Sequence, residues 1–188
     1  MDIIQAIRGY APWNEQEAED RLVLLRLLSS GEDLFSRDNA TAHMTASAWV
    51  TNPARNQVLM VYHNLYHSWS WLGGHADGER DLLGVALREV TEESGLISLR
   101  PLTPDLFSLE ILTVDGHEKR GKYVSSHLHL NVTYLIEADD AAPLRIKPDE
   151  NSGVRWFTPQ GAVEASTEPW FRERIYQKLN EKLRAFAR

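Results

Sequence analysis

The clearest structural signal in the sequence lies between Gly73 and Leu96, which reads GGHADGERDLLGVALREVTEESGL. It predicts a glycine turn followed by a short helix that carries Glu89, Glu92 and Glu93 in its last turns. A helix advances about 100° per residue, so this spacing places the three carboxylates within one arc of about 100°. Their mutual repulsion and the helix macrodipole both disfavour that arrangement, and a hard divalent cation would reverse both effects.

The flanking residues support a helix with two well-defined ends. Asp81 suits the N-cap position, and Gly95 suits the left-handed residue that follows a helix. An apolar stripe lies beside the acidic arc and consists of Leu83, Ala86, Leu87 and Val90. The helix can therefore pack on a sheet while its acids point along the edge of a cleft. A solvated acidic helix is the plainer interpretation, but it leaves the two glycines and Arg88 unexplained.

This segment resembles the signature box of the Nudix hydrolases. In that box a glycine, a glutamate and then the run R-E-apolar-x-E-E-x-G-apolar follow one another at fixed spacing. The positions that match are Gly74, Arg88, Glu89, Val90, Glu92, Glu93, Gly95 and Leu96. One position departs from the pattern, because Arg80 stands where the box has a glutamate and Glu79 lies one place earlier.

The resemblance implies an α/β fold, namely an α/β/α sandwich around a mixed sheet. It also implies Mg²⁺ or Mn²⁺ as the cofactor. The implied ligands are the carboxylates of the helix and one backbone carbonyl: Glu89, Glu92, Glu93 and Gly73. Arg88 would then orient Glu89 or another acid by a bidentate bond instead of contacting the substrate.

A later loop, residues 147–153, supplies one more carboxylate of interest. In Nudix enzymes a loop near this place often brings an acid to the metal site, and Glu150 is the best match, with Asp149 next. The alternative is an acidic surface turn, since proline, aspartate, asparagine and glycine all favour turns. Both Glu93 and Glu150 are candidates for the general base, and the sequence does not choose between them.

Composition limits the class of protein. The chain has 188 residues, 43% of them hydrophobic and 25% charged, as expected for one globular enzyme domain. Its formal net charge is −7, so we expect no nucleic acid partner, and no apolar run approaches a membrane span. It has no cysteine, which excludes disulfides and thiolate nucleophiles. Without a recognisable signal peptide, the expected location is the cytoplasm.

Helical and strand patterns alternate without a strict βαβ rhythm, which favours a mixed sheet. Residues 1–40 are expected to form a helical N-terminal extension, in which Asn14 caps a helix that reaches about Leu28. Residues 41–188 would form the Nudix hydrolase domain. Its last helix is expected from about Pro169 to Phe186. The extension could serve as a lid or as a homodimer interface.

Histidines outside the box are candidates for contact with the substrate. His127 and His129 alternate with leucines, so they lie on the polar face of a strand together with Asn131 and Thr133. That face is either solvated or lines a substrate cleft. A zinc site made from this histidine pair lacks a third ligand at a suitable spacing. The other two candidates are His63, in an aromatic run, and His75, inside the glycine turn.

The expected function is metal-dependent hydrolysis of a diphosphate linkage in a nucleoside diphosphate joined to another moiety. The partner would be a small nucleotide or diphosphate substrate. One alternative is a Nudix-like binding module that senses a nucleotide without cleaving it. An isomerase of isopentenyl diphosphate on the same fold requires an active-site cysteine, which this chain lacks.

Overall fold

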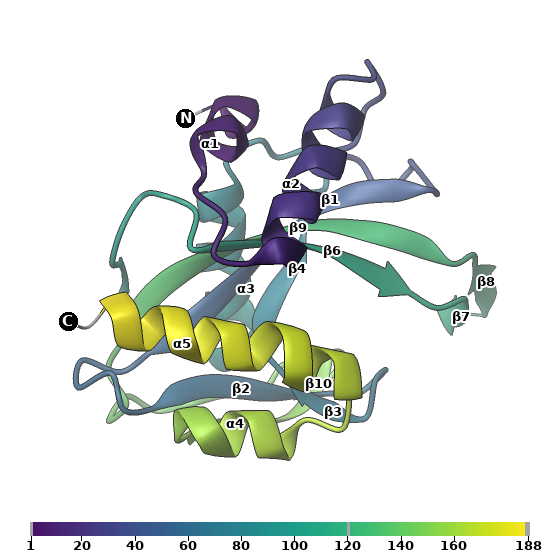
Figure 1. Cartoon of the computed structure of the whole chain (residues 1–188). Helices are drawn as coiled ribbons and strands as arrows, with labels where there is room; N and C mark the ends of the chain where they lie inside the picture. The colour runs from purple at the N-terminus through teal and green to yellow at the C-terminus, as the bar shows by residue number, and fades with distance from the viewer. Residues whose placement is uncertain (1, 120, 187–188) are drawn as a thin grey trace.

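The structure is a computed structural model that describes residues 2–119 and 121–186. Figure 1 shows a curled sheet with helices on both sides of it. The helices are α1 (Ile3–Gly9), α2 (Glu15–Leu28), α3 (Leu82–Ser94), α4 (Pro159–Ala165), the π-helical η1 (Phe171–Tyr176) and α5 (Gln177–Phe186). The strands are β1 (Ala42–Thr51), β2 (Val58–His63), β3 (Ser68–Ser70), β4 (Leu72–His75), β5 (Leu99–Pro101), β6 (Ser108–Val114), β7 (His117–Lys119), β8 (Lys122–Val124), β9 (His127–Ala138) and β10 (Asn151–Phe157).

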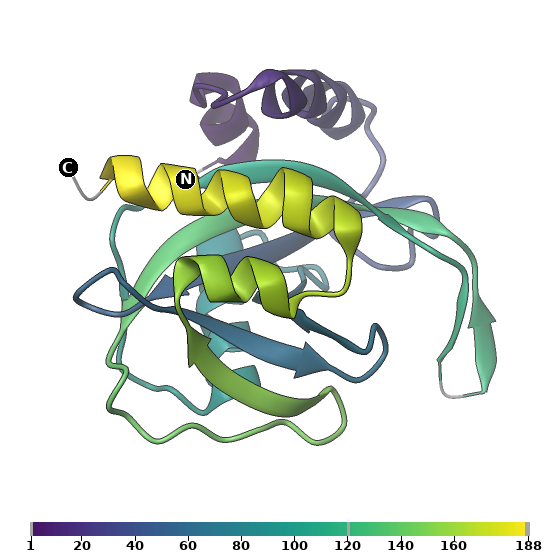
Figure 2. The same cartoon turned by 60° about the horizontal axis from the view of Figure 1, so that its bottom comes forward.

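The sheet is mixed, with β1 near its middle. Its strand order is β10-β2-β1-β9-β5, with β3 added to β2, β4 to β1 and β6 to β9. The pair β1–β9 is parallel along its whole length, from Ala42 opposite Leu128 to Thr51 opposite Glu137. The other pairs are antiparallel. Strands β7 and β8 form a separate hairpin that projects beyond one end of the sheet in both views (Figures 1 and 2).

Alternation along β1 and β9 divides the core between the two faces of the sheet. Met44 and Val132 belong to one buried cluster, which also contains Val85 and Val90 of α3. Trp49 and Leu135 belong to a second cluster, which contains Leu179 of α5. Figure 2 shows α4 and α5 in front of the sheet. The α/β/α sandwich around a mixed sheet that the sequence predicts is therefore confirmed, and so are helices at the N-terminus.

Polar residues on β9 are buried, so the solvated interpretation of this face is wrong. Asn131 and Thr133 are both fully buried, and both hydrogen-bond the equally buried Glu110 of β6. The amine of Lys178, on α5, lies 2.9 Å from the Glu110 carboxylate. A polar strand face can be buried in this way because a charged network satisfies its hydrogen-bonding groups.

The same network joins α2 to the rest of the molecule. Glu17 is fully buried and receives the amines of Lys182 at 2.9 Å and Lys178 at 3.2 Å. Its carboxylate also accepts a 2.7 Å hydrogen bond from the Tyr10 hydroxyl. Burial alone would raise the pKa of Glu17, but the two lysines lower it below its usual value. Residues of the N-terminal segment thus satisfy buried charges of the C-terminal helix.

Local signals at helix ends were read correctly from the sequence. Asn14 caps α2 and Asp81 caps α3, and Gly95 takes the left-handed conformation with φ 79°. The expected helix from Pro169 to Phe186 is present, although Phe171–Tyr176 is a π-helical turn. Among the residues that the structure describes, no helix combines the length and apolarity that crossing a bilayer requires.

Candidate active site and histidine cluster

The glycine turn packs directly against the acidic helix. A Cβ atom added to Gly74 would lie 2.5 Å from the carboxyl carbon of Glu89, and one added to Gly73 would lie 2.6 Å from the carbonyl oxygen of Ala46. These distances are far below van der Waals contact. At Gly73 the obstructing atoms include backbone, so only glycine fits there, whereas at Gly74 the end of the Glu89 side chain would have to move. The close approach of backbone and side chain explains why the sequence has two glycines here.

Glu93 is the most buried of the three acids, with 3% of its surface exposed. It accepts a 2.9 Å hydrogen bond from the backbone amide of Gly73. Burial raises its pKa to about 8, and the negative charges of Glu89 and Glu150 add to that rise. The pKa of Glu89 is raised by the same main cause, burial, although Arg88 donates a 3.2 Å hydrogen bond to its carboxylate.

Lys147 connects the helix to the later loop. Its amine lies 2.8 Å from the Glu92 carboxylate and 3.0 Å from that of Glu150. Burial alone would lower the pKa of this amine, but its hydrogen bonds to the two acids raise it above the usual value. The structure therefore brings Glu150 to the same place as the helix acids, held through a lysine.

The donor set fits a hard divalent cation. The available side-chain atoms are carboxylate oxygens, which Mg²⁺ and Mn²⁺ prefer. The pKa values of Glu89 and Glu93 are raised because burial disfavours their negative charge and nearby positive charge does not fully balance it. A cation would supply that compensation. Arg88, 3.9 Å from Glu92 as well as bonded to Glu89, already lies where it can orient both acids.

Among the residues that the structure describes, Glu79 forms no hydrogen bond or ion pair with Glu89, Glu92 or Glu93. It accepts hydrogen bonds from the backbone amides of Arg80 and Asp81, at 2.7 and 2.9 Å, just before α3 begins. The guanidinium of Arg80 lies over the ring of Phe35. The shift of one residue in the box thus gives Glu79 a role at the start of the helix.

The histidines divide between two places. His63 ends β2, opposite Asn151 of β10, and the next residue, Asn64, hydrogen-bonds the carbonyl oxygen of Glu150. His63 thus lies beside the loop that carries Glu150. His75, His127 and His129 lie together elsewhere, around His43 of β1, whose ring centre is within 5.1 Å of each of theirs.

Burial keeps His129 and His43 of this second group neutral. Burial lowers the pKa of His129 to about 2, and the neighbouring imidazoles His75, His43 and His127 lower it further in the same direction. Burial also lowers the pKa of His43.

Sequence reasoning missed His43 and Lys147. His43 lies near the start of β1, which begins at Ala42, and it was assigned no part from the sequence. The pairing of Lys147 with Glu92 spans 55 residues and has no local signal. The expectation that the pair His127 and His129 lacks a third neighbour of the same kind is wrong, because other strands supply His43 and His75.

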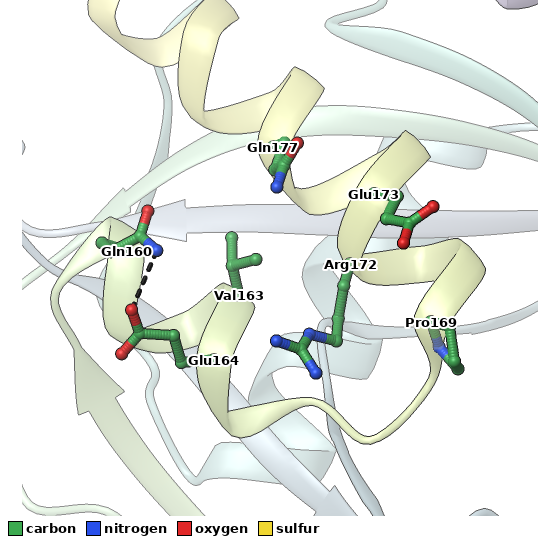
Figure 3. A pocket seen from close by; sticks show the side chains of 7 residues that line it. All are labelled: Gln160, Val163, Glu164, Pro169, Arg172, Glu173 and Gln177. Atoms are coloured by element: carbon green, nitrogen blue, oxygen red, sulfur yellow. Dashed lines mark hydrogen bonds between the residues drawn. The ribbon is translucent and has the colours of Figure 1, made fainter.

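A separate pocket of about 360 Å³ opens between α4 and the last helix (Figure 3). Its walls include Val163, Arg172 and Gln177. Gln160 and Glu164 on its rim hydrogen-bond each other at 2.9 Å. None of the candidate site residues lines it, so we assign it no part in the chemistry.

Solved structures with the same fold span most of the chain. A Nudix-family hydrolase of Clostridium perfringens is 19% identical, with a TM-score of 0.53, and covers 77% of this chain and 97% of its own. An Ap4A hydrolase of C. elegans, in a binary complex, is 18% identical, with a TM-score of 0.52 and coverage of 77% and 96%. The E. coli dihydroneopterin triphosphate pyrophosphohydrolase is 13% identical, with a TM-score of 0.53 and coverage of 76% and 95%. At these identities the likeness establishes the fold alone.

None of the curated proteins compared with the chain matches it. The family model described as the NUDIX domain does match, over residues 41–179. This range contains the glycine turn, the acidic helix and the Glu150 loop, and it is well over half of the sequence. The chain therefore belongs to the NUDIX domain family.

Proposed function

We propose that this Nudix protein hydrolyses the diphosphate linkage of a nucleoside diphosphate joined to another moiety, with Mg²⁺ or Mn²⁺ as cofactor. The observation that carries the proposal is a group of four carboxylates, those of Glu89, Glu92, Glu93 and Glu150. Three lie at the end of α3, and the fourth lies in the loop before β10, where Lys147 links it to Glu92. The names of two similar structures, an Ap4A hydrolase and a triphosphate pyrophosphohydrolase, support a phosphoric anhydride as the substrate class.

Metal binding is assigned to Glu89, Glu92 and Glu93, with the backbone carbonyl of Gly73. Bound ions would neutralise phosphate charge and make a water molecule more acidic. Gly74 lets the turn approach Glu89 of the helix, and Gly73 lets the same turn lie against β1, which supports this assignment. Arg88 acts as a positioning residue, because its guanidinium is bonded to Glu89 and close to Glu92.

The general base is assigned to Glu93 or Glu150. Glu93 is anchored by the Gly73 amide, which fixes one of its oxygens. The Glu150 carboxylate pairs with the amine of Lys147 and has 42% of its side chain exposed, so it can turn towards a water molecule. Because Glu93 is also assigned as a metal ligand, the substitution Glu150→Gln distinguishes the two. A large loss of turnover at saturating metal would assign the base to Glu150, and near-normal turnover would assign it to Glu93.

Substrate contacts are assigned to His63, His75, His127 and His129. The position of His63 beside the Glu150 loop supports its place near the carboxylates. The expected homodimer, the cytoplasmic location and the lack of a nucleic acid partner stay predictions.

The test is a substrate panel assayed with Mg²⁺ and with Mn²⁺. It should include nucleoside triphosphates, dinucleoside polyphosphates, ADP-ribose and nucleotide sugars, with chelator as the blank. We expect turnover with at least one of them, and a loss of about 100-fold or more in Glu92→Gln and Glu93→Gln. Glu15→Gln, an exposed substitution on α2, is the matched control and should keep full activity.

The alternative is a nucleotide sensor without catalysis. Saturable binding of a panel member without products, at any metal concentration, would favour the sensor. Near-normal turnover in both glutamate variants would overturn the roles assigned to α3.

A further inference from the structure

Three strands bring three imidazoles together. The parallel register of β1 and β9 places His43 opposite His129, and the antiparallel register of β1 and β4 places Thr45 opposite His75. One ring nitrogen from each of His43, His75 and His129 lies within 4.8 Å of the others. Tetrahedral ligands with metal–nitrogen bonds of 2.0–2.1 Å stand about 3.4 Å apart, so small ring rotations complete the geometry.

His43 is held in the tautomer that a metal ligand requires. Its Nδ1 lies 3.0 Å from the carbonyl oxygen of Asn39. A carbonyl oxygen only accepts, so Nδ1 carries the proton and the neutral ring keeps a lone pair on Nε2. Backbone carbonyls commonly orient metal-binding histidines in this way.

The Nε2 atom of His43 is buried and has no hydrogen-bond partner within the described part of the chain. The whole side chain is only 4% exposed. A buried polar atom normally has a partner, because leaving it without one costs about 1–3 kcal/mol. The atom belongs to a ring that has His75, His127 and His129 as its neighbours. A cation among these rings would satisfy it.

His127 extends the same arrangement. Its Nδ1 donates to the carbonyl oxygen of Ser125 at 2.8 Å, so its Nε2 also presents a lone pair. That Nε2 lies 3.3 Å from Nε2 of His129, close to the spacing of two ligands on one tetrahedral ion. His127 can therefore orient His129 or act as a fourth ligand.

Nearby charge does not oppose a cation. The guanidinium of Arg37 influences His43 and His129, but it is paired in two contacts with Asp77, one of them at 2.6 Å. The pair is neutral overall. The imidazoles are therefore the groups that decide what binds.

We propose that His43, His75 and His129 bind one divalent transition-metal ion of the Zn²⁺ or Co²⁺ type, with a ligand set distinct from the glutamates of α3. Imidazole nitrogen favours zinc, cobalt, nickel and copper, whereas Mg²⁺ favours oxygen. The two sets of ligands therefore differ in the ions that they select. The proposal is argued independently of the proposed hydrolase activity, although His75 and His129 are also assigned there as substrate contacts.

The test is a Co²⁺ titration of the full-length protein after metal removal with a chelator. Four-coordinate Co²⁺ on nitrogen ligands absorbs visible light far more strongly than six-coordinate Co²⁺ on carboxylates and water. We expect a strong visible band that saturates at about one equivalent and persists in millimolar Mg²⁺. His43→Gln and His129→Gln should each weaken Co²⁺ binding by about 100-fold or more.

Two matched controls accompany the titration. His67→Asn removes an exposed histidine whose φ of 50° asparagine also tolerates, and Glu89→Gln alters the acidic helix. Both should keep the band and the affinity. Circular dichroism checks folding, and the less buried His75→Gln replaces His43→Gln if that variant does not fold.

Crystals of the wild-type protein soaked in Co²⁺ give a second readout. An anomalous peak among the three imidazoles supports the site. The proposal is overturned by a peak at the glutamates alone, by a missing visible band, by unchanged affinity in the folded histidine variants, or by loss of the band in Glu89→Gln.

Discussion

The backbone amide of Gly73 donates a 2.9 Å hydrogen bond to the carboxylate of Glu93, which fixes the turn before α3 to the last turn of that helix. Gly73 also lies against Ala46 of β1, so the turn is held between a strand and a helix. The position of the acids therefore depends on backbone contacts as well as on the helix.

The two glycines should respond differently to alanine. In Gly73→Ala the new methyl group meets the Ala46 backbone, so we expect a loss of about 1–3 kcal/mol in the free energy of unfolding. In Gly74→Ala it meets only the end of the Glu89 side chain, which can rotate away. That variant should stay close to wild-type stability but lose at least about tenfold in Mg²⁺ affinity. Urea denaturation and metal titration measure both effects, and equal stability losses would contradict this account.

The raised pKa of Glu93 predicts a pH dependence of stability in the metal-free protein. Its pKa is about 8 in the folded chain, against an ordinary value of 4.5, so between these values the folded state keeps a proton that the unfolded state releases. The contribution of Glu93 to stability is thus present below pH 4.5 and is lost as the pH rises through 8.

We expect the free energy of unfolding of Glu93→Gln, minus that of the wild type, to rise by roughly 2–4 kcal/mol from pH 5 to pH 8. Urea denaturation in chelator measures it. Titrating groups that do not interact with Glu93 cancel in the difference, and a constant difference across this range would show that Glu93 is not protonated in the fold.

Loss of the buried charge of Glu17 should be costly. Glu17→Gln removes the buried carboxylate that pairs with Lys182, while Lys178 keeps its contact with Glu110, and breaking a buried pair costs about 3–5 kcal/mol. Chemical denaturation against the exposed substitution Glu15→Gln measures the difference. If the two variants unfold at the same denaturant concentration, the network does not stabilise the fold.

Removal of residues 1–40 tests the predicted domain boundary. We expect the fragment 41–188 to lose cooperative unfolding, because Glu17 is the buried acid that pairs Lys182 on α5. Thermal unfolding followed by circular dichroism measures this. A fragment with a sharp transition near that of the full chain would instead establish residue 41 as the start of an independent domain.

Local chemistry explains what the sequence predicted well. Caps such as Asp81 and Gly95 act within a few residues of the helix end, and they were placed correctly. Alternation along β9 gave the correct faces because side chains repeat every second residue. The sequence did not show whether the polar face of β9 is buried or solvated, because Lys178, which pairs with the buried Glu110, comes from a helix far along the chain.

Contacts that depend on strand pairing could not be predicted from the sequence for the same reason. His43 and His129 are neighbours only because β1 and β9 pair in parallel, and a parallel pair requires a long connection. No spacing in the sequence reports that register. Lys147 likewise meets Glu92 only after the whole sheet has formed.

Strand β1 sets the distance between the glycine turn of the acidic site and the imidazole group. Ala46, against which Gly73 packs, and His43, in the imidazole group, are three positions apart, or about 10 Å along the strand. A single inserted or deleted residue between them would turn one of the two onto the opposite face of the sheet. We therefore expect evolution to tolerate substitutions in this short span far more readily than changes of its length.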